Sequence, residues 1–126
     1  MVVLDASAVL AAILDEPGRG KLTPELLSSA ICSTVNLAEV QAKLISAGLP
    51  PDDALQTALT PVRETIDFTV AQAGLSGTLI AQTRRLGLSL GDRACLTLGI
   101  SLGVPVYTAD RAWKNLKLPV RIHVIR

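Results

Sequence analysis

Short apolar runs alternate with longer stretches of helical periodicity along this chain. Residues 1–5, MVVLD, form a β-branched apolar run typical of a buried parallel strand, and residues 6–16 then follow a helical pattern. Residues 30–33 resemble a second short strand, and the helix expected after them includes Glu39 and stops at Gly48. The first part of the chain therefore predicts two successive strand–helix units.

The alternation continues to the last residues. The further elements that we expect are a helix over 52–60, a candidate strand over 62–68, a helix over 69–87 weakened by Gly74 and Gly77, a helix over 87–103, a strand over 103–110, a short helical turn over 111–118 and a last strand over 119–125. The helix over 87–103 is apolar almost all round, which is typical of a buried helix. Strands that alternate with helices predict one α/β domain, residues 1–126, with a mostly parallel sheet.

Four acidic side chains fall at one edge of such a sheet. Asp5 ends the first strand, Glu39 lies early in the helix after the second, Asp92 opens the buried helix, and Asp110 follows the strand that ends at 108. The carboxyl ends of parallel strands share an edge, and the helices that follow begin at that same edge. We therefore expect these four carboxylates to lie together.

Asp92 has a second interpretation, which is purely structural. Ser89 followed by Asp92 matches the [ST]-x-x-[DE] capping signature, in which the two residues satisfy backbone N–H groups at the start of a helix. Taken alone, this segment does not decide between a cap and a functional site. The capping interpretation explains Asp92 but none of the other three acids.

Carboxylates that share an edge repel one another. The repulsion between two like unit charges about 4 Å apart is about 4 kcal/mol at an effective dielectric constant of about 20. Protonation or a bound cation must therefore relieve this repulsion. All-oxygen ligands without histidine or cysteine favour Mg²⁺ or Mn²⁺. Such an ion activates water and neutralises charge on a phosphoryl group, which makes phosphodiester hydrolysis the leading hypothesis.

Charge is distributed unevenly along the chain. Residues 1–78 hold four basic and nine acidic side chains, a net charge of −5, whereas residues 79–126 hold eight and two, a net charge of +6. This asymmetry favours an acidic site beside a positive track for a polyanion such as RNA, with Arg84, Arg85 and Arg93 as candidate phosphate contacts. The alternatives are that Arg93 pairs with a carboxylate, and that the charge asymmetry is only solvated surface.

Composition excludes several other classes. Hydrophobic residues make up 49% and charged residues 18% of the chain, which excludes disorder, and no apolar run approaches the ~20 residues of a membrane span. The first fourteen residues lack the basic segment of a signal peptide, so we expect a cytoplasmic protein. Cys32 and Cys95 are expected to be buried free thiols, and the single histidine, His123, a strand residue.

Four segments together resemble a known family. VLDASAV at the start, NLAEV around Glu39, GLSLGDRACLTL around Asp92 and VYTAD before Asp110 are similar to the PIN domain, most closely to the VapC-type toxins of bacterial toxin–antitoxin modules. The resemblance implies a three-layer α/β/α sandwich and a Mg²⁺- or Mn²⁺-dependent endoribonuclease that a small cognate antitoxin protein inhibits. It also implies a homodimer, consistent with a mean hydropathy of +0.44.

The resemblance also implies roles for individual residues. Asp5 and Asp92 match the principal metal-ligating aspartates, and Glu39 and Asp110 match the other acidic members of the site. The supporting residues implied are Ser7, in a position to orient a water at the metal, Thr108, the hydroxyl residue that accompanies the last aspartate, and Asn36, one helical turn before Glu39.

Three other functions compete with the toxin. A phosphoacceptor receiver domain needs an acceptor aspartate after a mid-chain strand, but Asp67 lies inside its apolar run and no lysine closely follows VYT. A non-catalytic RNA-binding module of the same fold is disfavoured because no acidic position is lost. A PIN-type RNA-processing nuclease outside a toxin–antitoxin module remains open.

Overall fold

The computed structural model describes residues 1–126. The strands are β1 (Val2–Leu4), β2 (Ala30–Ser33), β3 (Glu64–Ile66), β4 (Val106–Thr108) and β5 (Ile122–Val124). They form one sheet in the order β3-β2-β1-β4-β5, and every neighbouring pair is parallel. The sheet was predicted as mostly parallel, and its strand order differs from the 2-1-3-4-5 order of receiver domains.

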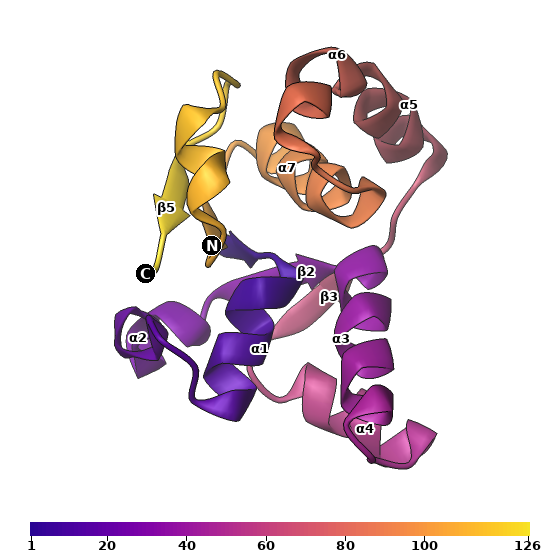
Figure 1. Cartoon of the computed structure of the whole chain (residues 1–126), viewed down its shortest axis with the longest axis vertical. Helices are drawn as coiled ribbons and strands as arrows, with labels where there is room; N and C mark the ends of the chain where they lie inside the picture. The colour runs from indigo at the N-terminus through magenta and orange to yellow at the C-terminus, as the bar shows by residue number, and fades with distance from the viewer.

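Helices cover both faces of this sheet. The helices are α1 (Ala6–Leu14), α2 (Pro24–Leu27), α3 (Thr34–Ser46), α4 (Pro51–Leu59), α5 (Val70–Thr78), α6 (Ile80–Thr83) and α7 (Leu90–Leu102), with 3-10 turns η1 (Arg19–Lys21), η2 (Arg84–Leu86) and η3 (Arg111–Asn115). Helices α1 to α4 lie on one side of the strands and α5 to α7 on the other (Figure 1). This arrangement confirms the predicted three-layer α/β/α sandwich.

Alternation along β1 divides the hydrophobic core into two clusters. Leu4 packs with residues of α1, α3 and α4, whereas Val3 packs with residues of α7 on the opposite face. Because successive side chains of a strand point to opposite faces, this short apolar strand serves both layers. Trp113 is fully buried in the second cluster.

The segment over 69–87 is not the single helix that its periodicity predicts. It is divided into α5, α6 and η2, and the first break falls at Leu79, which is buried in the second cluster. The Gln82 N–H donates to the Leu79 carbonyl only three residues back, at 3.0 Å, which is the tighter bonding of a 3-10 turn. Gly74 and Gly77 lie inside α5, Gly77 two residues before this break, and a Cβ on either would meet no atom within 4 Å.

Both cysteines are free and buried, which confirms the prediction. Burial raises the pKa of the Cys32 thiol to about 11 and that of Cys95 well above its usual value, so neither is a reactive thiolate at neutral pH. His123 lies on β5, as expected, and its ring stacks on Tyr107 with the centroids 4.7 Å apart. None of the helices combines the length and apolar character needed to cross a membrane.

Candidate functional site

Asp5 lies where β1 ends and α1 begins, and it is only 3% exposed. As the N-cap of α1 it accepts a hydrogen bond from the Ala8 N–H at 2.9 Å. Its Oδ1 also accepts from the Ser7 hydroxyl at 2.7 Å, and its Oδ2 from the Thr108 hydroxyl at 2.6 Å. Three donors therefore fix both oxygens of this carboxyl group.

Burial dominates the charge state of Asp5. It raises the pKa of this carboxyl from 3.8 to about 6, against the three hydrogen bonds, which favour the charged form. The negative charge of Asp92 raises the pKa of Asp5 further, as the smallest of the causes. Asp5 is thus a buried acid whose charged form is disfavoured mainly by the loss of hydration.

Two hydroxyl groups join Asp5 to the segment that carries Asp110. Ser7 Oγ accepts from the Ala109 N–H at 2.9 Å, and Thr108 Oγ1 accepts from the Asp110 N–H at 3.0 Å. Both hydroxyl groups also donate to Asp5. The Ser7 hydroxyl, which was expected to orient a water, therefore donates its proton to Asp5 in this structure and accepts from the residue after β4.

Glu39 is held in place by an asparagine one turn earlier on α3. Asn36 Nδ2 donates to Glu39 Oε1 at 2.8 Å and to the Gly91 carbonyl at 3.0 Å. Asn36 is only 1% exposed, so this amide is part of the packed contact between α3 and α7. The expected support of Glu39 by Asn36 is thus present as a hydrogen bond.

Asp92 caps helix α7 and also faces the other acids. The Ser89 N–H donates to Asp92 Oδ2 at 2.9 Å and the Asp92 N–H donates to Ser89 Oγ at 3.2 Å, which makes a complete capping box. Asp92 also lines the same hollow as Asp5. Capping α7 and facing the hollow are therefore compatible.

All four predicted acids line one surface hollow of about 210 Å³, hereafter the acidic hollow. Its lining residues are Asp5, Ala6, Ser7, Leu10, Glu39, Lys43, Asp92 and Asp110. The four acids come from four distant parts of the sequence, as the sheet-edge argument predicts. Lys43 was not predicted, although it lies one helical turn after Glu39 on the same face of α3.

The acidic hollow fits a hard divalent cation by the chemistry of its donors. Four carboxylates face it without any histidine or cysteine, and Mg²⁺ and Mn²⁺ prefer such oxygen ligands. No group of three acidic, histidine or cysteine side chains is already arranged to hold an ion. Mutual repulsion between carboxylates opposes such convergence in the protein alone.

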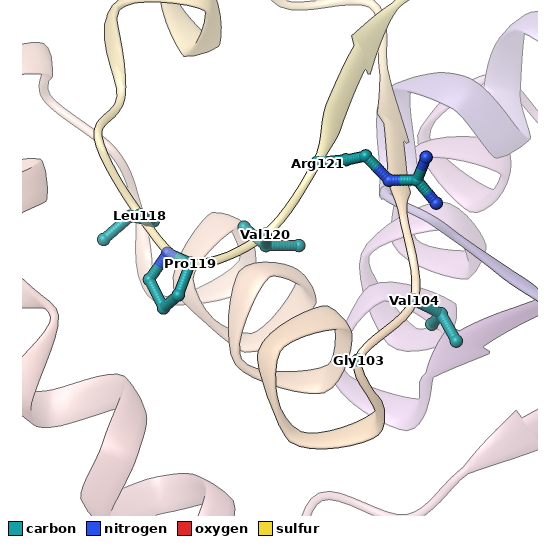
Figure 2. Close-up of a pocket in the computed structure, with 6 residues that line it drawn as sticks. All are labelled: Gly103, Val104, Leu118, Pro119, Val120 and Arg121. Carbon is teal, nitrogen blue, oxygen red and sulfur yellow. The ribbon is translucent and has the colours of Figure 1, made fainter.

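Other hollows of the surface lack this chemistry. One of about 380 Å³ lies at the opposite edge of the sheet, where the segments before β4 and β5 pass the end of α7. Figure 2 shows its lining, in which Arg121 is the only charged side chain. Of the five surface hollows, the acidic hollow is the one that acidic side chains line.

The three candidate RNA-binding arginines lie outside the acidic hollow. Arg84 and Arg85 are exposed on η2, and Arg85 lines a separate hollow of about 420 Å³. Arg93 Nη1 donates to the Ser76 carbonyl at 3.0 Å, so this side chain ties α7 to α5, and it forms no ion pair with a carboxylate. RNA contact by these arginines stays a prediction.

Comparisons with solved structures give the same fold. A VapBC2 complex from Rickettsia felis bound to a promoter DNA fragment matches with a TM-score of 0.77 and 20% identity, over 100% of both chains. A DNA-bound VapBC from Salmonella typhimurium matches with a TM-score of 0.76 and 19% identity, over 99% of this chain and 98% of that one.

A third similar structure is the Mycobacterium tuberculosis toxin VapC20, described as cleaving the sarcin–ricin loop. It matches with a TM-score of 0.71 and 17% identity, over 96% of this chain and 99% of that one. No curated protein matches this sequence. The PIN domain matches residues 2–118, nearly the whole length. This chain therefore belongs to the PIN domain family.

Proposed function

We propose that this protein is a Mg²⁺- or Mn²⁺-dependent endoribonuclease and the toxin of a toxin–antitoxin module. The observation that carries the proposal is the acidic hollow, in which Asp5, Glu39, Asp92 and Asp110 meet at the carboxyl edge of the sheet. A non-catalytic module of the same fold has no need to gather four acids from distant parts of the sequence around one hollow.

Asp5 and Asp92 are the principal residues that hold the cation in this proposal, with Glu39 and Asp110 completing the set. A divalent ion there supplies an activated water and neutralises charge on the scissile phosphate. The protein's own part is to keep the donors in place: Ser7 and Thr108 fix Asp5, and Asn36 fixes Glu39. Lys43, on the lining of the acidic hollow, is in a position to attract the RNA backbone.

The biological setting is supported by the structures that share this fold. One is described as a toxin–antitoxin complex, another as a member of the VapBC family of toxin–antitoxin systems, and a third as a toxin that cleaves the sarcin–ricin loop. From that likeness we propose RNA as the substrate, a small antitoxin protein as the inhibitory partner, and a homodimer as the working form. A PIN-type RNA-processing nuclease is the alternative that the experiments must separate.

The catalytic proposal is tested with purified protein, free of any antitoxin, and a labelled single-stranded RNA. We expect cleavage with Mg²⁺ or Mn²⁺, none with EDTA, and none by Asp5→Asn. Asp67→Asn, at an exposed acid beyond the end of β3, is the matched control and should cleave normally. Cleavage that survives EDTA contradicts the metal mechanism, and binding without cleavage favours the non-catalytic module.

The toxin proposal is tested in cells. Expression of the protein should arrest growth, Asp5→Asn should not, and co-expression of the proposed cognate antitoxin should restore growth. An enzyme that cleaves RNA in solution but leaves growth unaffected would instead support the RNA-processing alternative.

A further inference from the structure

Gly91 lies in the first turn of α7, directly before Asp92, where that helix meets α3. A Cβ atom placed on Gly91 would overlap Cδ, Oε1 and Oε2 of Glu39, the whole carboxylate group. These are the three heavy atoms nearest to that position. The space that any other residue would fill at position 91 is therefore occupied by the Glu39 carboxylate.

The backbone does not explain this glycine. Gly91 is absent from the residues with positive φ, so its conformation is open to any amino acid. Alanine is the better helix former, by up to about 1 kcal/mol in a helix interior. Contact with Glu39 is the feature of the structure that accounts for a glycine at this position.

Asn36 forms hydrogen bonds to both Glu39 and Gly91. Its Nδ2 atom bonds to Glu39 Oε1 at 2.8 Å and to the Gly91 carbonyl at 3.0 Å. Both partners are acceptors, so the donating nitrogen of this buried amide faces them. One side chain therefore links the carboxylate to the backbone of the glycine that accommodates it.

We propose that Gly91 is a positioning residue, which sets the Glu39 carboxylate in the acidic hollow beside Asp92. The inference rests on the proposed function for its consequence, because a displaced Glu39 leaves the set of residues that holds the cation. A glutamate side chain has several rotatable bonds, and fixing it beforehand lowers the entropic cost of binding an ion. The glycine and Asn36 together provide that preorganisation.

The first test uses metal-free protein, so that it does not depend on nuclease activity. In EDTA, Gly91→Ala should shift the carboxyl ¹³C resonance of Glu39 and the side-chain amide resonances of Asn36 in NMR spectra. Gly77→Ala is the matched control, because a Cβ there meets nothing within 4 Å, and it should leave both resonances unchanged. Unchanged resonances in Gly91→Ala would overturn the inference, whatever the protein does to RNA.

The second test measures Mn²⁺ affinity by calorimetry without RNA. Gly91→Ala should weaken binding roughly 10- to 100-fold, the usual effect of losing a residue that orients a ligand. Gly77→Ala should bind as the wild type does. Equal Mn²⁺ affinity in wild type and Gly91→Ala would refute the positioning role while leaving the proposed nuclease function intact.

A double-mutant cycle shows whether the effect passes through Glu39. In a Glu39→Ala background the clash is gone, so adding Gly91→Ala should cause no further loss of Mn²⁺ affinity. This double variant also remains folded if crowding by Glu39 is what destabilises Gly91→Ala. A loss of equal size in both backgrounds would show that the substitution acts on α7 or Asp92 instead.

Discussion

The Thr108 hydroxyl donates a 2.6 Å hydrogen bond to Asp5 Oδ2, although 103 positions of sequence separate the two residues. Thr108 Oγ1 in turn accepts a hydrogen bond from the Asp110 N–H at 3.0 Å. One fully buried hydroxyl therefore joins the end of β1 to the residue that follows β4. Two of the four acids depend on it for their positions.

Removing this hydroxyl should destabilise the fold at the acidic hollow. Thr108→Val keeps the side-chain shape but leaves Asp5 Oδ2 without this donor and the Asp110 N–H without an acceptor, so we expect a loss of about 1–3 kcal/mol in the free energy of unfolding. The pKa of Asp5 should rise further, because this hydrogen bond lowers it. Urea unfolding and NMR titration measure the two effects, and Thr108→Ser, which keeps the hydroxyl, should show neither.

The raised pKa of Asp5 makes the stability of metal-free protein depend on pH. Between about pH 4 and pH 6 the folded state retains a proton that the unfolded chain has already lost, so stability falls as pH rises through this window. A pKa shift from 3.8 to about 6 corresponds to roughly 3 kcal/mol in the free energy of unfolding, and this stabilisation is lost above pH 6.

Asp5→Asn should remove that dependence. Asparagine stays neutral, so the variant should lose the slope between pH 4 and pH 6 and exceed the wild type in stability at pH 8 in EDTA. Denaturant unfolding across this pH range measures the difference, with Asp67→Asn as the control at an exposed acid. A slope equal to that of the wild type would show that Asp5 is not the titrating group.

The two roles of Asp92 should separate by mutation. Asp92→Asn retains an oxygen for the Ser89 N–H, so stability should change little while Mn²⁺ binding and cleavage collapse. Ser89→Ala removes the other half of the capping box and should cost about 1 kcal/mol of stability with Mn²⁺ affinity preserved. Full cleavage activity in Asp92→Asn would mean that Asp92 only caps α7.

Lys43 should contact the RNA backbone. It is exposed, lines the acidic hollow and forms no ion pair, so its charge is available to a phosphate. In an Asp5→Asn background, Lys43→Ala should weaken RNA binding and reduce the log–log salt slope by about 0.7. Lys21, exposed on η1 and outside every surface hollow, supplies the control substitution. Equal slopes for the two variants would exclude the contact.

Arg84 and Arg85 offer a parallel test of the basic half of the chain. Their joint replacement by alanine in the same background should flatten the salt slope by up to about 1.4 and weaken different RNAs about equally. An unchanged slope would show that these basic side chains do not bind RNA, and that the charge asymmetry of the chain reflects only its solvated surface. Arg93→Ala should instead lower stability, because its guanidinium holds the Ser76 carbonyl.

The acidic hollow was predictable because it depends on topology alone. Asp5 directly follows β1 and Asp110 comes two residues after the end of β4, and parallel strands bring such positions together at one edge of the sheet. The exact division of the helix over 69–87 was not predictable in this way, because the break at Leu79 lies where the chain packs against α7 in the second cluster, a tertiary contact that local periodicity does not show. Helix α2 was missed although Thr23 and Pro24 form a standard helix start, because it has only four residues.

Gly91 and Lys43 show two further limits of sequence reasoning. Gly91 and Glu39 lie on different helices, so no local sequence pattern predicts the contact between them. Lys43 had a signal, its spacing of four from Glu39, but the same spacing also describes a simple surface ion pair. Only the orientation of α3 places the lysine on the acidic hollow.

The central place of β1 sets the order in which the site comes into being during synthesis. This strand leaves the ribosome before the other four strands, yet it pairs with β4 as well as β2, and Asp5 accepts a hydrogen bond from Thr108. A nascent chain that displays Asp5 and Glu39 still lacks Asp92 and Asp110, and chains emerge from their N-terminus. The acidic hollow is therefore completed only after α7 and the end of β4 have been synthesised, and a partly synthesised chain lacks any activity that depends on all four acids.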